Sequence, residues 1–250
     1  MSSSLKSTLA AVFIGGLFVA PAIGADLDGP ASRKTDRADA TAVFWGLNGK
    51  EDAYFLYGGA VHALNGDLAS EGYLLRGFVG FGEYDYRNSG IAGGKVDGDI
   101  VSLDASVGYQ IFVDNMRLTG YVGVAFENND LSPNDPGNST RGDEVGVKLQ
   151  GEIASVGLAP WHWSALASYG SANDSYWARV RVGYEVTQFI IGPEGLLMGN
   201  DEYDGQRIGG FITLPQLGAV SVSLSGGYAD VDGTQGDSSA YGSVDFSTAF

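Results

Sequence analysis

The sequence predicts an all-β protein, a single antiparallel up-and-down transmembrane β-barrel of about 12 strands. Composition is the first observation: 39 of the 250 residues are glycine, 13 are tyrosine and 12 are phenylalanine, and mean hydropathy is close to zero. The second is a series of segments in which apolar and polar residues alternate, as in strands with one apolar face. The third is the arrangement of the connections. Composition alone fits a secreted β-sandwich equally well, so the segments and connections decide.

The N-terminal residues 1–25 have the features of a secretory signal peptide. Lys6 supplies a positive charge, 9–20 is an apolar run, and 22–25 offers small residues for cleavage. This run is too short for a membrane span and is excluded from the fold. Residues 26–40 are polar with mixed charge and no period, and we expect a disordered periplasmic N-terminus there. The predicted barrel occupies 41–250.

Charge and cysteine content exclude several classes of protein. The full chain has 14 basic and 30 acidic residues, and loss of Lys6 with the signal peptide leaves a net charge near −17. Such a charge argues against a nucleic-acid partner or an anionic-surface binder. The chain has no cysteine, so an exported fold would have to be stable without disulfides.

About twelve alternating segments follow residue 40, most of them close to the length that a tilted strand needs to cross a bilayer. They are 41–49, 53–64, 72–87, 98–113, 116–128, 142–156, 160–170, 175–186, 188–199, 205–214, 219–231 and 240–250.

The last segment illustrates the alternation. One face carries Val244, Phe246, Thr248 and Phe250, and the other carries Tyr241, Ser243, Asp245 and Ser247. A half-apolar final strand is typical of a barrel in which the last strand pairs with the first and removes the sheet edges.

The connections favour the barrel over the sandwich. Odd-numbered ones are predicted to be often long and polar, at 88–97, 129–141, 201–204 and 232–239, with shorter ones at 48–52 and 171–174. Even-numbered ones are predicted to be mostly short, at 114–115, 157–159, 187 and 215–218, with 65–71 the longest. Long loops at one end and tight turns at the other are typical of outer-membrane barrels. An even strand number then places both termini on the periplasmic side.

Charged and aromatic residues at inward-facing positions are the candidate lumen lining. They are Arg76, Arg117, Tyr121, Lys148, Glu152, Trp177, Arg179, Arg181, Glu185, Glu194 and Arg207, and Asp104, Glu127 and Glu144 share the inward parity. A charged side chain on the lipid face would cost about 2–4 kcal/mol near the bilayer midplane. The charged residues of the strands are therefore expected to occupy inward-facing positions.

Two interpretations of the lining stay open. In the first, side chains of mixed sign pair across the lumen and fill a narrow barrel, with Arg179 and Arg181 pairing with carboxylates such as Glu185, Glu152 or Glu194. In the second, the lining is a constriction that orients a passing saccharide, with Trp177, Tyr121 and Tyr84 as flat faces for sugar rings. Mixed signs argue against a channel for acidic sugars, which would need a basic lining.

Other chemistry has weaker support. His162 lies two residues from Ser164, but no nucleophile motif surrounds the serine, so a barrel hydrolase is the least favoured function. The run from Asp230 to Gly233 opens like a calcium loop but has no glutamate at its twelfth position. We predict no catalytic residue, cofactor or metal site.

Four stretches resemble the BcsS family of cellulose biosynthesis proteins: 72–86 (GYLLRGFVGFGEYDY), 131–138 (LSPNDPGN), 175–185 (SYWARVRVGYE) and 191–211 (IGPEGLLMGNDEYDGQRIGGF). The resemblance runs across nearly the whole mature chain. It implies an outer-membrane barrel linked to bacterial cellulose production, with outer-membrane lipid and a glucan chain or other cellulose-synthesis components as partners. It supplies no catalytic or binding residues. We therefore expect a non-enzymatic component of cellulose (exopolysaccharide) biosynthesis or export. The alternative is a saccharide-specific or general outer-membrane channel.

Overall fold

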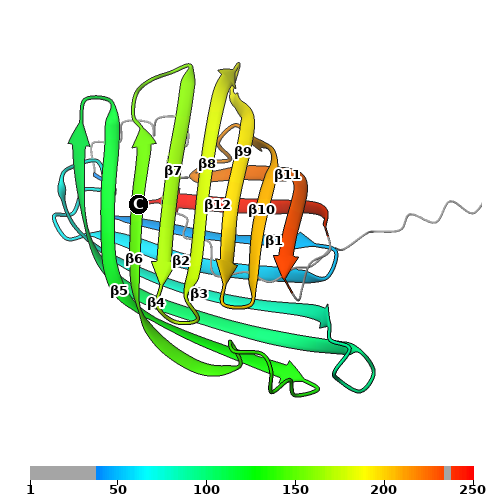
Figure 1. The fold of residues 1–250 in the computed structure, drawn as a ribbon. Helices are drawn as coiled ribbons and strands as arrows, with labels where there is room; N and C mark the ends of the chain where they lie inside the picture. The colour runs from blue at the N-terminus through cyan, green and yellow to red at the C-terminus, as the bar shows by residue number, and fades with distance from the viewer. Residues whose placement is uncertain (1–37, 234–237) are drawn as a thin grey trace, which may run out of the picture.

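The computed structural model describes residues 38–233 and 238–250, which form a closed barrel of twelve antiparallel strands (Figure 1). The strands are β1 (Thr41–Lys50), β2 (Ala53–Ala63), β3 (Gly72–Arg87), β4 (Lys95–Val113), β5 (Met116–Ser132), β6 (Gly142–Ser155), β7 (Trp161–Gly170), β8 (Ser175–Val186), β9 (Phe189–Asn200), β10 (Tyr203–Thr213), β11 (Val220–Gly233) and β12 (Ser239–Ala249). The predicted fold class and strand number are confirmed. Among the described residues no helix is long and apolar enough to cross a membrane.

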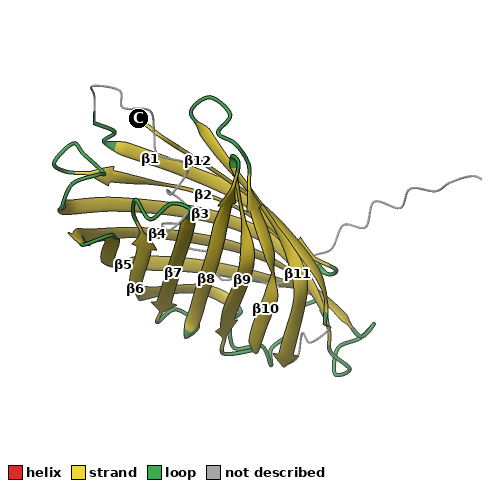
Figure 2. Ribbon diagram, turned by 90° about the horizontal axis from the view of Figure 1, so that it is seen from above, coloured by secondary structure: helices red, strands yellow, loops and turns green. Residues whose placement is uncertain are grey.

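The barrel is closed by pairing of the last strand with the first. In this pairing Ala42 lies opposite Ala249 and Trp45 opposite Phe246, whose rings stack with centroids 5.4 Å apart. Each other strand pairs with its neighbours in the sequence, so the chain winds once around the barrel (Figure 2). Closure leaves no strand edge exposed.

The predicted N-terminal segments fall mostly outside the described residues. This holds for the signal peptide at 1–25 and for 26–37 of the predicted disordered segment. The described residues just before β1 are hydrogen-bonded to the barrel. The Asp39 carbonyl accepts from the Leu68 amide at 2.9 Å, and the Ala40 amide donates to the Phe250 carbonyl at 2.9 Å.

The barrel has two ends, which we name by their connections. The terminal end holds the start of β1 and the end of β12, together with 64–71, 114–115, 156–160, 187–188 and 214–219. The distal end holds 51–52, 88–94, 133–141, 171–174, 201–202 and the connection between β11 and β12.

The predicted contrast in connection length between the two ends is observed only in part. At the distal end 88–94 and 133–141 are long and 51–52 is short, as predicted, but 201–202 is a tight turn. At the terminal end 64–71 is the longest connection, as predicted, and 214–219 is close to it in length. Strand length differs as well: β3, β4 and β5 contain 16, 19 and 17 residues, against 10 in β1 and β7. In Figure 1 these cyan and green strands reach furthest toward the lower right, at the distal end.

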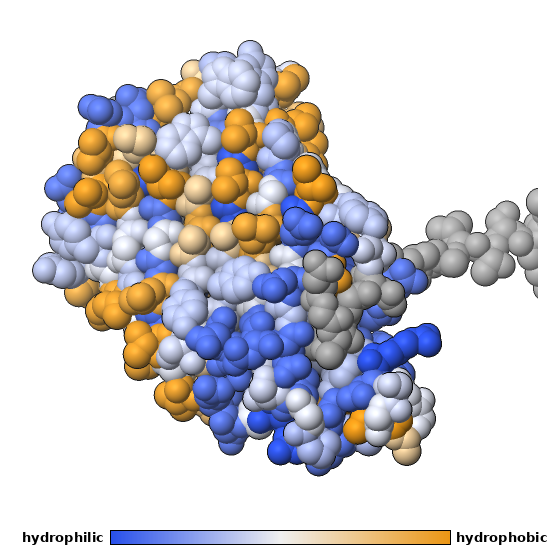
Figure 3. Space-filling model, viewed as in Figure 1, coloured by the Kyte–Doolittle hydropathy of each residue, from blue (hydrophilic) through white to orange (hydrophobic). Residues whose placement is uncertain are grey.

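The outer wall changes from apolar to polar along this extension. Leu103 and Val124 are exposed on the outer face of β4 and β5, whereas Asp97, Asp99 and Asp130 take the corresponding positions further toward the distal end. Figure 3 shows hydrophobic side chains over the upper and left part of the face and hydrophilic ones at the lower right. The polar extension therefore projects beyond the apolar belt that a bilayer would cover.

Candidate functional site: the barrel lumen

The predicted lumen residues all lie at inward-facing strand positions. Nine of the eleven are buried, namely Arg76, Tyr121, Lys148, Glu152, Trp177, Arg179, Arg181, Glu194 and Arg207. Arg117 and Glu185 are half-buried near the terminal end of β5 and β8. Of the other inward acids, Asp104 and Glu127 are buried and Glu144 is exposed at the distal end.

Asp104 on β4 is the centre of one ion-pair cluster. Its Oδ1 lies 2.5 Å from Arg76 Nη1 and its Oδ2 lies 2.6 Å from Lys148 Nζ. The Arg76 guanidinium also lies over Phe44 and Phe78, 5.7 and 5.4 Å from the ring centroids. One carboxylate thus holds two cations from β3 and β6, and aromatic faces cover the cation that is furthest from water.

Asp245 on β12 is the centre of a second cluster. Its Oδ2 lies 3.1 Å from Arg181 Nη2 and 3.7 Å from Arg179 Nη1. Arg181 Nε also donates to Glu194 Oε2, and Tyr241 donates to Glu194 Oε1 at 3.1 Å. This cluster joins strands from β8 to β12.

Tyr57 joins the two clusters. Its hydroxyl donates to Asp245 Oδ1, and its ring stacks on Phe78 with centroids 6.3 Å apart. The side chain reaches from β2 to β12 across β1, which is possible because residue 46 there is glycine. A Cβ at Gly46 would lie 2.3 Å from the Tyr57 hydroxyl oxygen and 2.6 Å from the Val244 carbonyl oxygen. Charged and aromatic side chains therefore form one continuous layer through the middle of the lumen, which we call the plug.

Sequence reasoning missed the central role of Asp245 and Tyr57. Asp245 was visible as an inward-facing acid on the last strand, but nothing in the sequence indicated its partners. The expected pairing of Arg181 with Glu194 is observed. Glu185 instead lies near the terminal end, 3.3 Å from His162 Nε2. Ser164 is buried opposite Arg181 in the neighbouring strand.

The connection 133–141 folds inward over the distal mouth. Its Asp135, Asn138 and Thr140 are buried. Asp135 Oδ2 accepts hydrogen bonds from the Tyr86 hydroxyl and from Asn88 Nδ2, both at 2.7 Å. These two bonds, that from Tyr86 being the stronger influence, hold the pKa of the Asp135 carboxyl below its ordinary value.

The same connection reaches across the mouth to the turn between β9 and β10. The Ser139 amide donates to Glu202 Oε1 at 2.6 Å, and the Ser139 hydroxyl donates to the same oxygen. Beside it, Asn173 in the β7–β8 turn donates to Glu127 Oε2 at 2.9 Å. The connection 133–141 is thus bonded to a turn on the other side of the mouth, and the β7–β8 turn is bonded to an inward-facing residue of β5.

The terminal mouth is covered by the connection 64–71. Gln110, an inward-facing residue of β4, donates to the carbonyls of Leu68 and Ser70 at 2.9 and 2.6 Å. Leu68 packs against the buried cluster of the barrel. The Phe112 amide also donates to Glu71 Oε1 of this connection at 3.3 Å. Both covers are therefore held by carboxamide and carboxylate groups.

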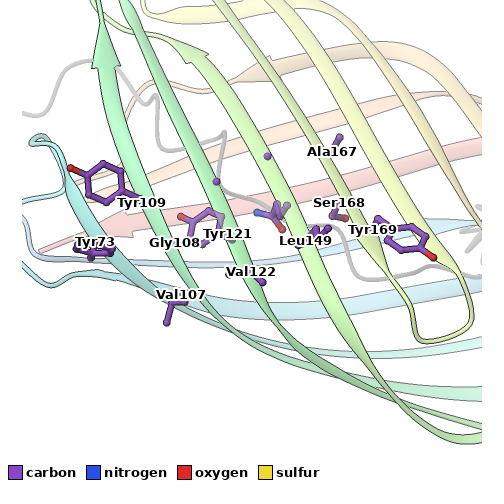
Figure 4. A pocket seen from close by; sticks show the side chains of 13 residues that line it. Tyr73, Val107, Gly108, Tyr109, Tyr121, Val122, Leu149, Ala167, Ser168 and Tyr169 are labelled. Carbon is purple, nitrogen blue, oxygen red and sulfur yellow. The ribbon is translucent and has the colours of Figure 1, made fainter.

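The outer wall also has a hollow of about 690 Å³ across β4 to β7, beside Tyr73 of β3 (Figure 4). Small residues Gly120, Gly151 and Ala167 are part of its lining. In Figure 4 Tyr109 and Tyr169 lie toward its two ends. It opens on the side that outer-membrane lipid is expected to cover, away from the lumen. In residues 38–233 and 238–250 no three His, Cys, Asp or Glu side chains are grouped to hold a metal ion.

A closed antiparallel barrel with an apolar outer belt and a charged interior defines the class of outer-membrane β-barrels. Residues 42–250 match the family model of cellulose biosynthesis protein BcsS, and the chain belongs to this family. The resemblance found in the sequence is confirmed.

Solved structures of similar fold include outer-membrane proteins with little sequence identity. The COG4313 outer membrane channel from Pseudomonas putida F1 has a TM-score of 0.54 and 12% identity, over 85% of this chain and 96% of that one. LpxR from Salmonella typhimurium has a TM-score of 0.50 and 13% identity, over 84% and 100%. The KdgM porin has a TM-score of 0.48 and 10% identity, over 84% and 99%. At these identities the likeness concerns the fold alone. A search of curated proteins gave no match.

Proposed function

We propose that this protein is a non-enzymatic outer-membrane component of cellulose biosynthesis or export, with a lumen that the plug keeps closed. Family membership supports the cellulose pathway. The observation that carries the closed lumen is the sharing of Asp104 by Arg76 and Lys148 and of Asp245 by Arg179 and Arg181. Charged side chains that pair with one another in the middle of the barrel occupy the space through which a substrate would have to pass.

The polar distal extension supports an orientation. Outer-membrane barrels carry their larger polar structures on the extracellular side. We therefore place the distal end outside the cell and both termini in the periplasm. Cysteines at Gly93 and Pro136, both exposed distal residues, should react with an impermeant thiol reagent on intact cells. Cysteines at Asn115 and Gln216 should not, and equal labelling of both sets would contradict this orientation. The matching prediction for Gly236 concerns a position outside the described residues.

Deletion of the gene in its host tests the proposed role. Surface cellulose should fall, and re-expression of the wild-type chain should restore it. A deletion strain with normal cellulose would contradict the proposal. If the protein is instead a saccharide channel, purified protein in planar bilayers should show steady conductance that added oligosaccharide blocks.

A further inference from the structure

We propose that the connection 133–141 is a lid over a binding site at the distal mouth, and that this site takes a neutral, unbranched glucan chain. The inference rests on the proposed function for the choice of glucan. It adds a location, the residues that would contact the chain, and the element that must move. The lid is defined as 133–141, and the vestibule as the inner wall beneath it around Tyr84 and Tyr86.

The vestibule wall carries two stacked aromatic rings. Tyr84 and Tyr86 lie on β3 with ring centroids 6.2 Å apart and planes inclined by 18°. A Cβ at Gly98 on β4 would lie 2.2 Å from Tyr84 Cζ, so only glycine there lets the ring lie flat against the wall. Aromatic rings of this kind can pack against the C–H face of a pyranose once the cover over them is removed.

The lid places polar groups on this wall in the pattern that sugar hydroxyls would supply. The Tyr86 hydroxyl donates to Asp135 and accepts from Asn138 Nδ2 at 3.3 Å. Asn129 accepts from the Tyr84 hydroxyl at 2.6 Å and donates to Thr140 Oγ1 at 2.9 Å. If the lid leaves, these buried donors and acceptors need new partners, and a chain of hydroxyl groups can both donate and accept.

The charge of the mouth favours a neutral chain over an acidic one. Glu127, Glu144 and Glu202 all lie around this end, together with Asp135. Apart from outer-face residues, the described basic residues at this end are Lys50, buried at the distal end of β1, and Arg141 of the lid, whose Nη1 donates to Asn134 at 2.5 Å. They are fewer than the four acids. A uronate chain would meet carboxylates at close range, whereas a glucan carries no charge to repel.

The latch of the lid is the contact between Ser139 and Glu202. It links the lid to a turn that is separated from it in the barrel by β7 and β8; Ser139 is exposed and Glu202 is half-buried. The rest of the lid is held by side-chain hydrogen bonds within the mouth. A ligand that needs the open lid binds with an apparent affinity reduced by the fraction of molecules that are open.

Isothermal titration of the purified full chain with cellohexaose tests the lid and the site together. Glu202→Ala removes the latch and should tighten the apparent affinity by about tenfold, because the open fraction rises. Tyr86→Leu in the Glu202→Ala background should abolish binding, since the flat ring is lost. Tyr86→Phe in the same background keeps the ring and should retain most of the binding. Tyr73→Leu, on the outer wall, is the matched control and should change nothing.

Three results would overturn the inference: no heat of binding for the Glu202→Ala variant, equal affinity in the Tyr86→Leu and Tyr86→Phe variants, or tighter binding of hexagalacturonate than of cellohexaose. The last would mean that an acidic saccharide is the ligand. Failure here with loss of cellulose in the deletion strain would leave the proposed function standing. Normal cellulose in that strain would contradict the proposed function whatever the titration gives.

Discussion

The middle of the lumen and its distal mouth both carry networks of hydrogen-bonded and ion-paired side chains, but the two networks are built on different elements. In the plug, the paired side chains Arg181, Glu194 and Asp245 all stand on strands of the barrel. At the mouth, Asp135 and Ser139 stand on a connection and bond to Tyr86 and Glu202. Strand positions are fixed by the hydrogen bonds of the sheet on both sides. The connection 133–141 is joined to the barrel at its two ends and by side-chain hydrogen bonds. We therefore expect the mouth to open more readily than the plug.

Disrupting the ion pairs of the plug should therefore cost more free energy of unfolding than disrupting the hydrogen bonds of the latch. Removing one partner of a buried ion pair costs on the order of 3–5 kcal/mol, because the other charge stays buried without compensation. At the latch neither Ser139 nor Glu202 is buried, so each hydrogen bond there contributes on the order of 1 kcal/mol, because water replaces the lost partner. Variants in the two regions can test this difference.

The largest effect is expected for the double variant Arg179→Ala, Arg181→Ala. It removes both arginines that contact Asp245 and the one that contacts Glu194. The unfolding temperature should fall clearly, by more than for Arg87→Ala, which removes an exposed arginine from the outer face of β3. Conductance in planar bilayers should be nearly unchanged. Wild-type melting together with a shift toward cation selectivity would instead mean a solvated lumen and an open path.

Asp104→Ala tests the second half of the plug. Arg76 and Lys148 would then be two buried like charges that lack their shared carboxylate. We expect a loss of on the order of 3–5 kcal/mol in the free energy of unfolding, measured by urea titration in detergent. Asp97→Ala removes a carboxylate from the outer face of the same strand, where Lys95 contacts it at 2.8 Å. That exposed pair should contribute at most about 1 kcal/mol, so similar losses in both variants would contradict burial as the cause.

Gly46→Ala should have a smaller effect on the junction between the clusters. The new methyl would meet the Tyr57 hydroxyl and the backbone of β12, and overpacking of this kind costs about 1–3 kcal/mol. Gly77→Ala is the matched control, because a Cβ there has no neighbouring atom within 4 Å. Urea unfolding of the two variants gives the comparison. If both lose the same stability, the cost comes from the strand backbone and not from displacement of Tyr57.

How well the sequence predicted each region follows from the local physics. Alternation located all twelve strands, because each strand has lipid on one side and the packed lumen on the other. It ended β5 too early, since beyond the apolar belt the outer positions become polar, as at Asp130, although Asn129 remains buried inside. The alternation of side chains along each strand also identified which charged residues face the lumen. It could not predict which of them contact one another, because those contacts depend on how the strands are staggered around the barrel. The contact of Tyr57 with Asp245 needs that stagger and the missing side chain at Gly46.

The smallest expected effect concerns the pH dependence of the lid. Hydrogen bonds from Tyr86 and Asn88 favour the ionised form of Asp135, so its pKa is lower in the closed lid than in an open one. A lowered pKa in the closed state stabilises the closed lid at pH values above the ordinary aspartate pKa of about 3.9. This contribution is lost as the pH falls through the lower value.

Hydrogen exchange of residues 133–141 in the folded protein tests this dependence. After correction for the intrinsic exchange rate, exchange should be constant from pH 7 to pH 5 and faster in stronger acid. Glu202 is a second carboxylate at the lid, so Asp135→Asn separates the two: the variant should lose most of the step if Asp135 causes it. A full step in Asp135→Asn would assign the pH dependence to the latch instead, and the absence of any step in the wild type would contradict the role of the Asp135 carboxylate.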